Sequence, residues 1–289
     1  NKARIRGMVV THGHEDHIGG IPYLLKEINV PIYGTPLTLG ILSKKLKEHG
    51  LLRSAKLMDV QPGDTIKLGE FRIEFIRVNH SIADAVAIAL HTPAGTVVHT
   101  GDFKIDSTPI DGDMIDLTRF GDLGRKGVLA LLSDSTNVER GGFSMSERKV
   151  GHTFEELFRG CDKRIIVATF ASNVHRVQQI INCAIDNGRK VAVSGRSMIN
   201  VVNVAANLGY LNVPDNVLVD IEMIRNSPAN EMVIVTTGSQ GEPMSALHRI
   251  AFSEHRQVEI IPGDMIIISA NPIPGNEKLV NKVINELMK

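Results

Sequence analysis

The sequence contains no tryptophan, only three tyrosines and two cysteines, and no excess of charge of either sign. So few aromatic rings disfavour the stacking platforms with which many proteins bind nucleobases. Lys and Arg together number 32, as do Asp and Glu, so the formal net charge of zero gives no indication of a polyanionic partner. These absences favour an enzyme that acts on a small molecule.

The chain also lacks a cysteine motif, a long apolar run and a targeting segment. Cys161 and Cys183 lie too far apart for a CxxC motif, and we interpret them as buried thiols in a reducing cytoplasm. No stretch approaches the ~18 apolar residues that span a bilayer, so no membrane partner is expected. The chain starts at Asn1 without a methionine and runs directly into an apolar strand, so we expect the natural protein to begin upstream.

The 289 residues suffice for one large or two ordinary domains, and the pattern of predicted strands and helices changes near residue 145. Alternating apolar and polar residues at 71–78 and apolar runs at 85–90 and 96–100 predict short strands, while 18–28 and 38–48 predict helices. A run at 128–132 predicts a buried strand. We therefore expect one domain at residues 1–145 and a second at residues 146–289.

Residues 146–289 repeat the order strand, polar loop and helix. Strands are predicted at 164–170, 190–193 and 231–235, and a helical pattern follows each of them. Alternation of this kind is typical of a parallel sheet, which binds ligands at the carboxyl ends of its strands. The loops around Ser172, Ser194 and Gly238 should therefore meet at one edge of the sheet.

Histidine is plentiful, and residues 11–17 read Thr-His-Gly-His-Glu-Asp-His. Imidazole and carboxylate groups are preferred ligands of Zn²⁺ and similar ions. His12 and His14 can turn toward one ion, and Asp16 and His17 can reach a second ion nearby. The run is neither homopolymeric nor terminal, which disfavours a tag remnant, and surface loop histidines are the other alternative.

Two more residues close later strands, because His80 follows the strand at 71–78 and Asp102 follows the strand at 96–100. Either residue alone is more often an ordinary loop residue than a ligand. Together with the first cluster they predict a metal centre with the ligands His12, His14, Asp16, His17, His80 and Asp102.

These motifs resemble the metallo-β-lactamase fold, an αββα sandwich of two sheets between helices. Further motifs resemble those of the ribonuclease J family of β-CASP nucleases, in which an α/β domain on a mostly parallel sheet is inserted into that fold. They are VVTHGHEDHIGG at 9–20, SDSTN at 133–137, ATFASN at 168–173, SGRSM at 194–198 and TTGSQGEP at 236–243.

The resemblance implies a site for two divalent ions, with Zn²⁺ expected and Mn²⁺ or Mg²⁺ as alternatives. One ion would be held by His12, His14 and His80, the other by Asp16 and His17, with Asp102 bridging them. Two ions that share a carboxylate lower the pKa of a bound water to about 7, which yields a hydroxide nucleophile.

Three carboxylates are the expected catalytic residues: Asp16, Asp102 and Asp134. The resemblance places Asp134 at the rim of the site, where it would orient a ligand imidazole or the attacking water. The alternative is an aspartate that only caps the loop after its strand.

The family resemblance further implies a ribonuclease that acts 5′-to-3′ from 5′-monophosphate ends and also cuts internally, in RNA maturation and decay including rRNA processing. The 5′-phosphate is expected where helix N-termini, hydroxyls and cations gather. The candidate residues are Ser172, Asn173, Arg176, Ser194, Gly195, Arg196, Ser197, Gly238 and Ser239. The alternative is that these residues form ordinary helix caps and turns.

The family pattern continues beyond Lys289, with two further histidines and a closing strand, and one of those histidines completes the second metal shell. We therefore expect a fragment that lacks both flanks, from a cytoplasmic protein that forms a homo-oligomer (dimer or tetramer). His248 and His255 are expected to be helix-surface residues. A small-molecule hydrolase of the lactamase fold and an inactive truncated scaffold are the alternative functions, and the repeated units after residue 145 argue against the first.

Overall fold

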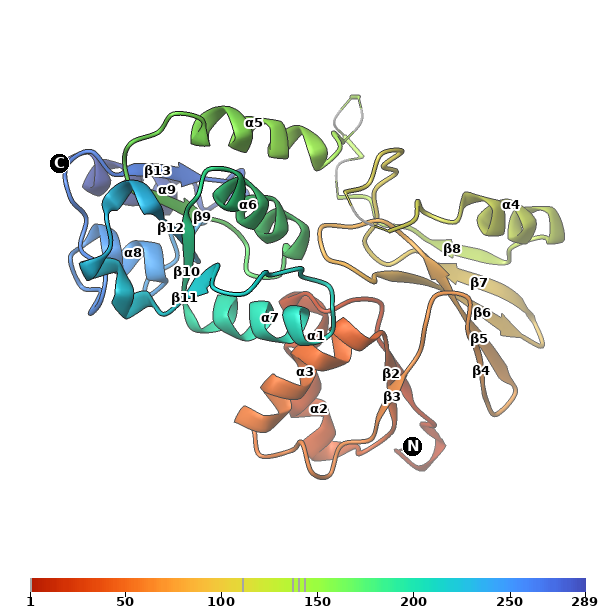
Figure 1. Ribbon diagram of the computed structural model, residues 1–289. Helices are drawn as coiled ribbons and strands as arrows, with labels where there is room; N and C mark the ends of the chain where they lie inside the picture. Colours follow the sequence, from red (N-terminus) through yellow and green to blue (C-terminus); the bar gives the residue numbers. More distant parts are fainter. Residues whose placement is uncertain (1, 111, 137, 140, 143) are drawn as a thin grey trace. The chain divides into compact units, whose positions relative to one another are not determined.

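The computed structural model describes residues 2–110, 112–136, 138–139, 141–142 and 144–289. The chain divides into two compact units, Asn1–Arg148 and Lys149–Lys289 (Figure 1). Among the described helices the longest, α3 (Pro36–Glu48) and α6 (Val174–Asp186), have 13 residues each. No helix in these residues is long and apolar enough to cross a bilayer.

The first unit contains two β-sheets. A parallel sheet has the order β1-β2-β3, formed by Met8–Val9, Ile32–Gly34 and Leu57–Asp59. The other sheet has the order β4-β5-β6-β7-β8, formed by Thr65–Leu68, Phe71–Arg77, Val86–Thr92, Gly95–His99 and Ala130–Leu132. Its strands are antiparallel except for β8, which pairs in parallel with β7.

Helices cover the outer faces of both sheets, so the first unit has four layers. α1 (Glu15–Ile18), α2 (Ile21–Glu27) and α3 pack on the parallel sheet around a buried cluster that includes Leu25, Ile32 and Leu42. A second cluster fills the space between the sheets, and its buried residues include Ile73 and Phe75 of β5. Successive side chains of a strand point to opposite faces. Residue 74 therefore faces outward, where α4 (Leu117–Lys126) covers the sheet. These layers form the predicted αββα sandwich.

Two local expectations for the first unit were wrong. The strand predicted as buried at 128–132 is β8, whose Leu131 is 63% exposed, because β8 lies at the edge of its sheet. The single helix predicted at 18–28 is broken into α1 and α2 at Gly19 and Gly20. A Cβ atom on Gly19 would lie only 2.6 Å from the carbonyl oxygen of Glu15, so the chain turns here at a residue without a side chain.

The second unit contains one sheet of five strands, all paired in parallel. The order β11-β10-β12-β9-β13 is formed by Leu218–Val219, Lys190–Ser194, Met232–Thr236, Ile165–Ala168 and Met265–Ile268. β9, β10 and β12 are the three strands that the sequence predicted. The parallel α/β architecture of this unit is therefore confirmed.

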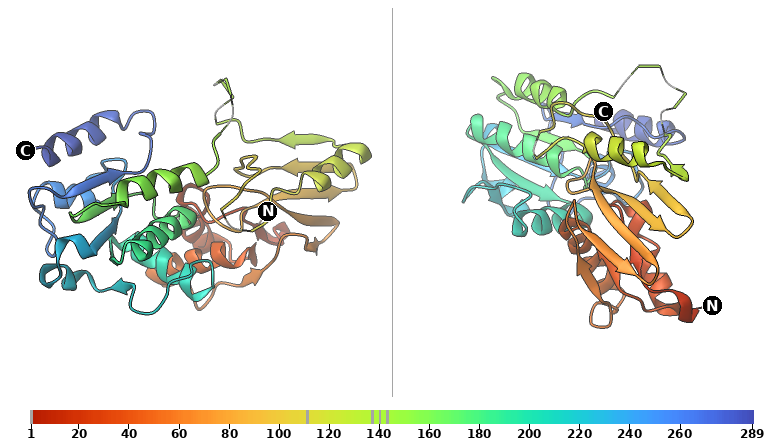
Figure 2. Two further views of the ribbon diagram at one scale, coloured as in Figure 1. Left: turned by 45° about the horizontal axis from the view of Figure 1, so that its top comes forward. Right: turned by 90° about the vertical axis from the view of Figure 1, so that its right-hand side faces the viewer.

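The remaining helices of this unit are α5 (Arg148–Phe158), α6, α7 (Arg196–Asn207), α8 (Ala246–Ala251) and α9 (Glu277–Leu287). Short 3-10 helices span Lys2–Arg4 in the first unit and Ile221–Asn226 and Ala229–Glu231 in the second. The connections that contain α6 and α7 step toward the β11 edge of the sheet, and the connection that contains α8 steps toward the β13 edge. Because such crossovers are right-handed, α6 and α7 lie on one face of the sheet and α8 lies on the other (Figure 2). The face of α8 and α9 encloses Ile166, Ile234 and Val283.

Candidate metal centre and carboxyl-edge loops

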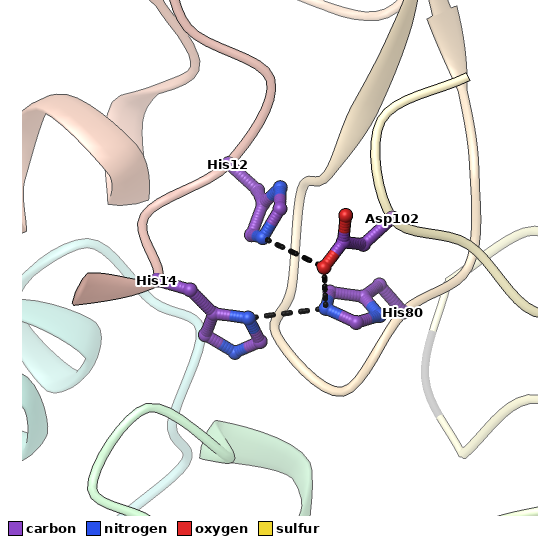
Figure 3. A group of neighbouring side chains, drawn as sticks. All are labelled: His12, His14, His80 and Asp102. Atoms are coloured by element: carbon purple, nitrogen blue, oxygen red, sulfur yellow. Dashed lines mark hydrogen bonds and ion pairs between the residues drawn. The ribbon is translucent and has the colours of Figure 1, made fainter. Parts of the chain in front are cut away.

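Four predicted ligands converge from three separate loops of the first unit (Figure 3). His12 and His14 lie between β1 and α1, His80 lies between β5 and β6, and Asp102 follows β7. Gly101, with φ of +58°, allows the Asp102 loop to approach the first loop closely. A Cβ atom on Gly101 would lie 3.1 Å from Cβ of Thr11, so a larger residue would push the two loops apart.

The ligand atoms of this first group lie within 4.8 Å of one another. His80 Nε2 is 3.0 Å from His14 Nδ1. Oδ2 of Asp102 lies 3.9 Å from His12 Nε2 and 3.8 Å from His80 Nε2. Three ring nitrogens and one carboxylate oxygen thus surround one small volume.

Asp16 and His17 form a second group with the same Asp102. His17 Nε2 lies 3.4 Å from Asp16 Oδ2 and 3.5 Å from Asp102 Oδ2. The Asp16 side chain is 78% exposed, whereas the His12 side chain is 1% exposed. The first group is therefore enclosed and the second is open to solvent, with Asp102 shared between them.

Burial keeps the histidines of the first group neutral. It lowers the pKa of His12 to about 2, with help from the neighbouring His14, His17 and His80. Burial, followed by the proximity of His80, lowers the pKa of His14 to about 4. It also lowers the pKa of His80, although Asp102 acts in the opposite direction. Neutral imidazole is the form that binds metal ions.

A divalent metal ion fits this donor set. Nε2 of His12 is buried and has no hydrogen-bond partner in the described part of the chain, which is costly for a polar atom unless a ligand satisfies it. That atom faces Asp102 and lies among the other ligand atoms. Nitrogen donors with a carboxylate suit Zn²⁺ or another first-row transition ion.

Asp134 lies next to this centre, and its carboxylate is engaged locally. Its Oδ1 accepts hydrogen bonds from the backbone N–H (2.9 Å) and the hydroxyl (2.7 Å) of Thr136. Burial acts to raise the pKa of Asp134, but these bonds, a bond from Phe103 N–H and the nearby His80 outweigh it and lower the pKa. The predicted catalytic role of Asp134 stays a prediction, while the loop-capping alternative describes the contacts that its carboxylate makes.

In the second unit, parallel pairing brings the loops after β9, β10 and β12 to one edge of the sheet, as the sequence predicted. Ser172 lies in the loop after β9, and Asn173 caps α6 by accepting a hydrogen bond from the N–H of Arg176 at 3.1 Å. The Arg176 guanidinium donates to the carbonyl of Ser269 at 2.6 Å. Asn173 and Arg176 therefore make structural contacts, and the phosphate contacts expected of these residues stay a prediction.

The segment that starts at the end of β10 has both buried and exposed polar side chains. Ser194 is buried, and its Oγ lies 2.9 Å from His255 Nε2. Gly195, with φ of +101°, is the N-cap of α7, which has no side-chain cap. Arg196 and Ser197 in the first turn of α7 are exposed.

The loop after β12 is buried at residues 238–241. Gly238 packs against Ser245 and Leu247 at the start of α8, and Ser239 is buried. Sequence reasoning included Gln240 only as part of the candidate segment at 238–241, without a role of its own. Its Nε2 donates to Asn271 O at 2.9 Å, and its Oε1 accepts from Ile273 N–H at 2.7 Å. These bonds fix the loop after β13, which the sequence analysis missed because the strand before it is a short apolar run.

The expectation of two helix-surface histidines was wrong for His255. It lies beyond the end of α8, where its Nδ1 accepts hydrogen bonds from the N–H groups of Gln257 and Val258. His248 does lie on α8, and its ring stacks on Phe252 with centroids 4.5 Å apart.

Comparison with known proteins agrees with this architecture. Family models match residues 1–131 (metallo-beta-lactamase superfamily) and residues 162–287 (ribonuclease J, beta-CASP domain). The whole chain is 51% identical to a ribonuclease J of Synechocystis sp. and 49% identical to one of Helicobacter pylori. It is 47% identical to one of Thermus thermophilus over 99% of its length. The chain spans 45%, 42% and 51% of these relatives, about half their length.

Among solved structures, a protein of unknown function from Enterococcus faecalis matches with a TM-score of 0.59 and 15% identity, over 97% of this chain and 73% of that one. At that identity the likeness shows the fold alone.

The first unit and its ligand cluster thus place the chain among proteins of the metallo-β-lactamase superfamily, with a β-CASP domain after it in the sequence. The chain belongs to the ribonuclease J family, as its motifs predicted.

Proposed function

We propose that this protein is a metal-dependent ribonuclease that hydrolyses phosphodiester bonds of RNA. The observation that carries the proposal is the convergence of His12, His14, His80 and Asp102 in a protein of this family. Divalent ions held there would activate water at neutral pH and offset the negative charge of the phosphodiester. Zn²⁺ is the proposed ion because nitrogen donors predominate in the buried group.

The two ligand groups have different roles in the proposed reaction. The buried histidines stay neutral and keep their ring nitrogens available as ligands, because burial opposes their protonation. Asp102 holds the two groups at a fixed separation through one shared oxygen. The exposed Asp16 and the half-buried His17 leave room for a polymeric substrate on the open side of the centre.

We also propose that the enzyme degrades RNA from a 5′-monophosphate end and cuts internally as well. Support comes from the exposed start of α7, where Arg196 and Ser197 offer a cation and a hydroxyl beside a helix N-terminus without a side-chain cap. Such a position favours an anionic group. The other predicted contacts are more buried or are engaged in capping, so we expect them to matter less.

The test compares RNA hydrolysis by the unaltered chain, His14→Ala and His152→Ala. His152 is an exposed histidine of α5 that contacts Glu155 at 3.3 Å, so it is a matched control outside the ligand groups. Purified proteins are supplied with Zn²⁺ or Mn²⁺ and given RNA with a 5′-monophosphate, or the same RNA with a 5′-hydroxyl.

We expect His14→Ala to lose activity by about 100-fold or more, because loss of even an indirect metal contact commonly costs 10- to 100-fold. His152→Ala should behave like the unaltered chain. Equal activity in all three proteins would overturn the proposed site. Equal rates on the two RNAs would overturn the 5′-monophosphate preference alone.

A further inference from the structure

Asp84 lies in the loop that carries His80, but its carboxylate reaches another element. The loop is closed by a hydrogen bond from Val78 N–H to Ala85 O, so His80 and Asp84 belong to one compact turn. Asp84 Oδ2 accepts from the N–H of Leu37 at 2.8 Å. Its Oδ1 accepts from the hydroxyl of Thr35 at 2.8 Å.

These contacts make Asp84 the cap of α3. Thr35 occupies the N-cap position of α3, but its own side chain caps none of the first N–H groups. Pro36 has no N–H, so the first free donor of the helix belongs to Leu37, and the carboxylate of Asp84 accepts from it. A carboxylate at a helix N-terminus also interacts favourably with the helix dipole. The His80 loop is thereby fastened to α3 by a charge-assisted contact.

The same end of α3 supports the loop of His12 and His14. Gly13, between these two histidines, packs so closely that a Cβ atom there would lie 3.2 Å from Cα of Thr38. It would also lie 3.5 Å from Cδ1 of Ile82, which belongs to the His80 loop. The start of α3 therefore contacts both ligand-bearing loops.

Asp84 has an unfavourable backbone conformation. Its φ is +55°, in the left-handed region that non-glycine residues seldom adopt, although Asp and Asn tolerate it better than most. The turn thus places the carboxylate against α3 in a conformation that the surrounding contacts must hold.

We infer that Asp84 is a positioning residue for the metal centre, which holds the His80 loop at the N-terminus of α3 and so keeps His80 in register with His12 and His14. The inference rests on the proposed function, because it assigns Asp84 a task only if the three histidines bind a metal ion. It concerns residues of this chain alone and can be measured without RNA.

The test measures affinity for Zn²⁺ alone, by titration against a chelating indicator, in the full chain. Asp84→Gly removes the carboxylate and relieves the positive φ, and Asp84→Asn retains an acceptor for Leu37 N–H. Thr35→Val removes the hydroxyl that bonds to Asp84 from the α3 side. Asp116→Gly is the matched control, because Asp116 caps α4 through Arg119 N–H at 2.9 Å and no candidate ligand lies on α4.

We expect Asp84→Gly to weaken Zn²⁺ binding by about tenfold, in the range typical of indirect metal contacts, and Thr35→Val to weaken it several-fold. Asp84→Asn should stay within about threefold of the unaltered chain, because it retains the bond to Leu37. Absorption spectra of the Co²⁺-loaded proteins should change for Asp84→Gly and not for Asp116→Gly. Melting temperatures report how much each variant loses in stability alone.

A purely structural role would give Asp84→Gly and Asp116→Gly a lower melting temperature with unchanged Zn²⁺ affinity and Co²⁺ spectrum, and that result would overturn the inference. His14→Ala serves as the reference for loss of a direct ligand. If His14→Ala binds Zn²⁺ as tightly as the unaltered chain, the proposed metal centre fails and the inference fails with it. If only His14→Ala is impaired, the metal centre stands and Asp84 has no part in it.

Discussion

Oδ2 of Asp102 lies 3.5 Å from Nε2 of His17, and the same oxygen lies 3.9 Å from Nε2 of the buried His12. One carboxylate oxygen therefore faces the enclosed and the open ligand group together. No other predicted ligand among the described residues belongs to both groups. A change at this residue should thus affect two ions, whereas a change at His14 should affect one.

Asp102→Ala is predicted to weaken the binding of both ions by about 100-fold or more, beyond the usual effect of an indirect contact. Titration with Zn²⁺, followed by measurement of bound metal per chain, checks this. Asp113→Ala is the control, because Asp113 is an exposed carboxylate paired with Arg77 at 2.7 Å. Retention of one tightly bound ion by Asp102→Ala would contradict the shared role.

Gly13→Ala is predicted to destabilise the first unit by about 1–3 kcal/mol and to weaken metal binding, since the added methyl group is forced against α3. It would lie 3.2 Å from Thr38 Cα and 3.3 Å from Ile41 Cδ1. Gly20→Ala is the matched control, with nothing within 4 Å of its added Cβ. Urea unfolding measures both free energies, and equal values for the two variants would refute the packing argument.

We expect the carboxyl group of Glu74 to make a pH-dependent contribution to the free energy of unfolding. A hydrogen bond from Arg119 lowers the pKa of this buried carboxyl against the effect of burial, and His91 contributes further. Because the folded pKa lies below the unfolded value, the stabilisation is complete above about pH 4.5 and is lost as the pH falls through the folded pKa.

Glu74→Gln should therefore cost about 2 kcal/mol at pH 7, and the difference from the unaltered chain should shrink on acidification below pH 4.5. Urea unfolding of both proteins at pH 7 and at pH 3 makes the comparison. A difference that stays constant or grows at low pH would show that the charge of Glu74 does not supply the effect.

Gly241→Ala is predicted to destabilise the second unit by more than the ~1–2 kcal/mol expected for a left-handed backbone alone. Its φ is +68°, and the added Cβ would lie 2.5 Å from the carbonyl oxygen of Leu279. Gly188→Ala isolates the backbone effect, because Gly188 has φ of +65° and open space around it. The two variants should differ by about 1–3 kcal/mol in thermal or urea unfolding, and equal losses would exclude a role for the close approach of α9.

The sequence predicted structural features and a group of candidate ligands where the residues concerned lie close together in the chain. The first four candidate ligands lie within the six residues 12–17, so their shared chemistry can be recognised without a tertiary structure. Regular alternation of strand, loop and helix predicted the parallel sheet of the second unit for a similar reason. α4 was missed because Gly121 and Gly124 reduce its helix propensity, and its stability comes from packing of Leu123 and from the bond between Arg119 and Glu74.

The sequence by itself determined the family and the parallel sheet of the second unit and predicted the candidate ligands, because each of these depends on residue type and local spacing. Tertiary structure alone decided that one oxygen of Asp102 serves two groups, that Asp84 caps a helix 47 residues away, and that β8 is exposed. Each of these depends on loops or strands that meet only after the layers have packed. Contacts over such separations leave no periodic pattern in the sequence, because their partners are chosen by the fold.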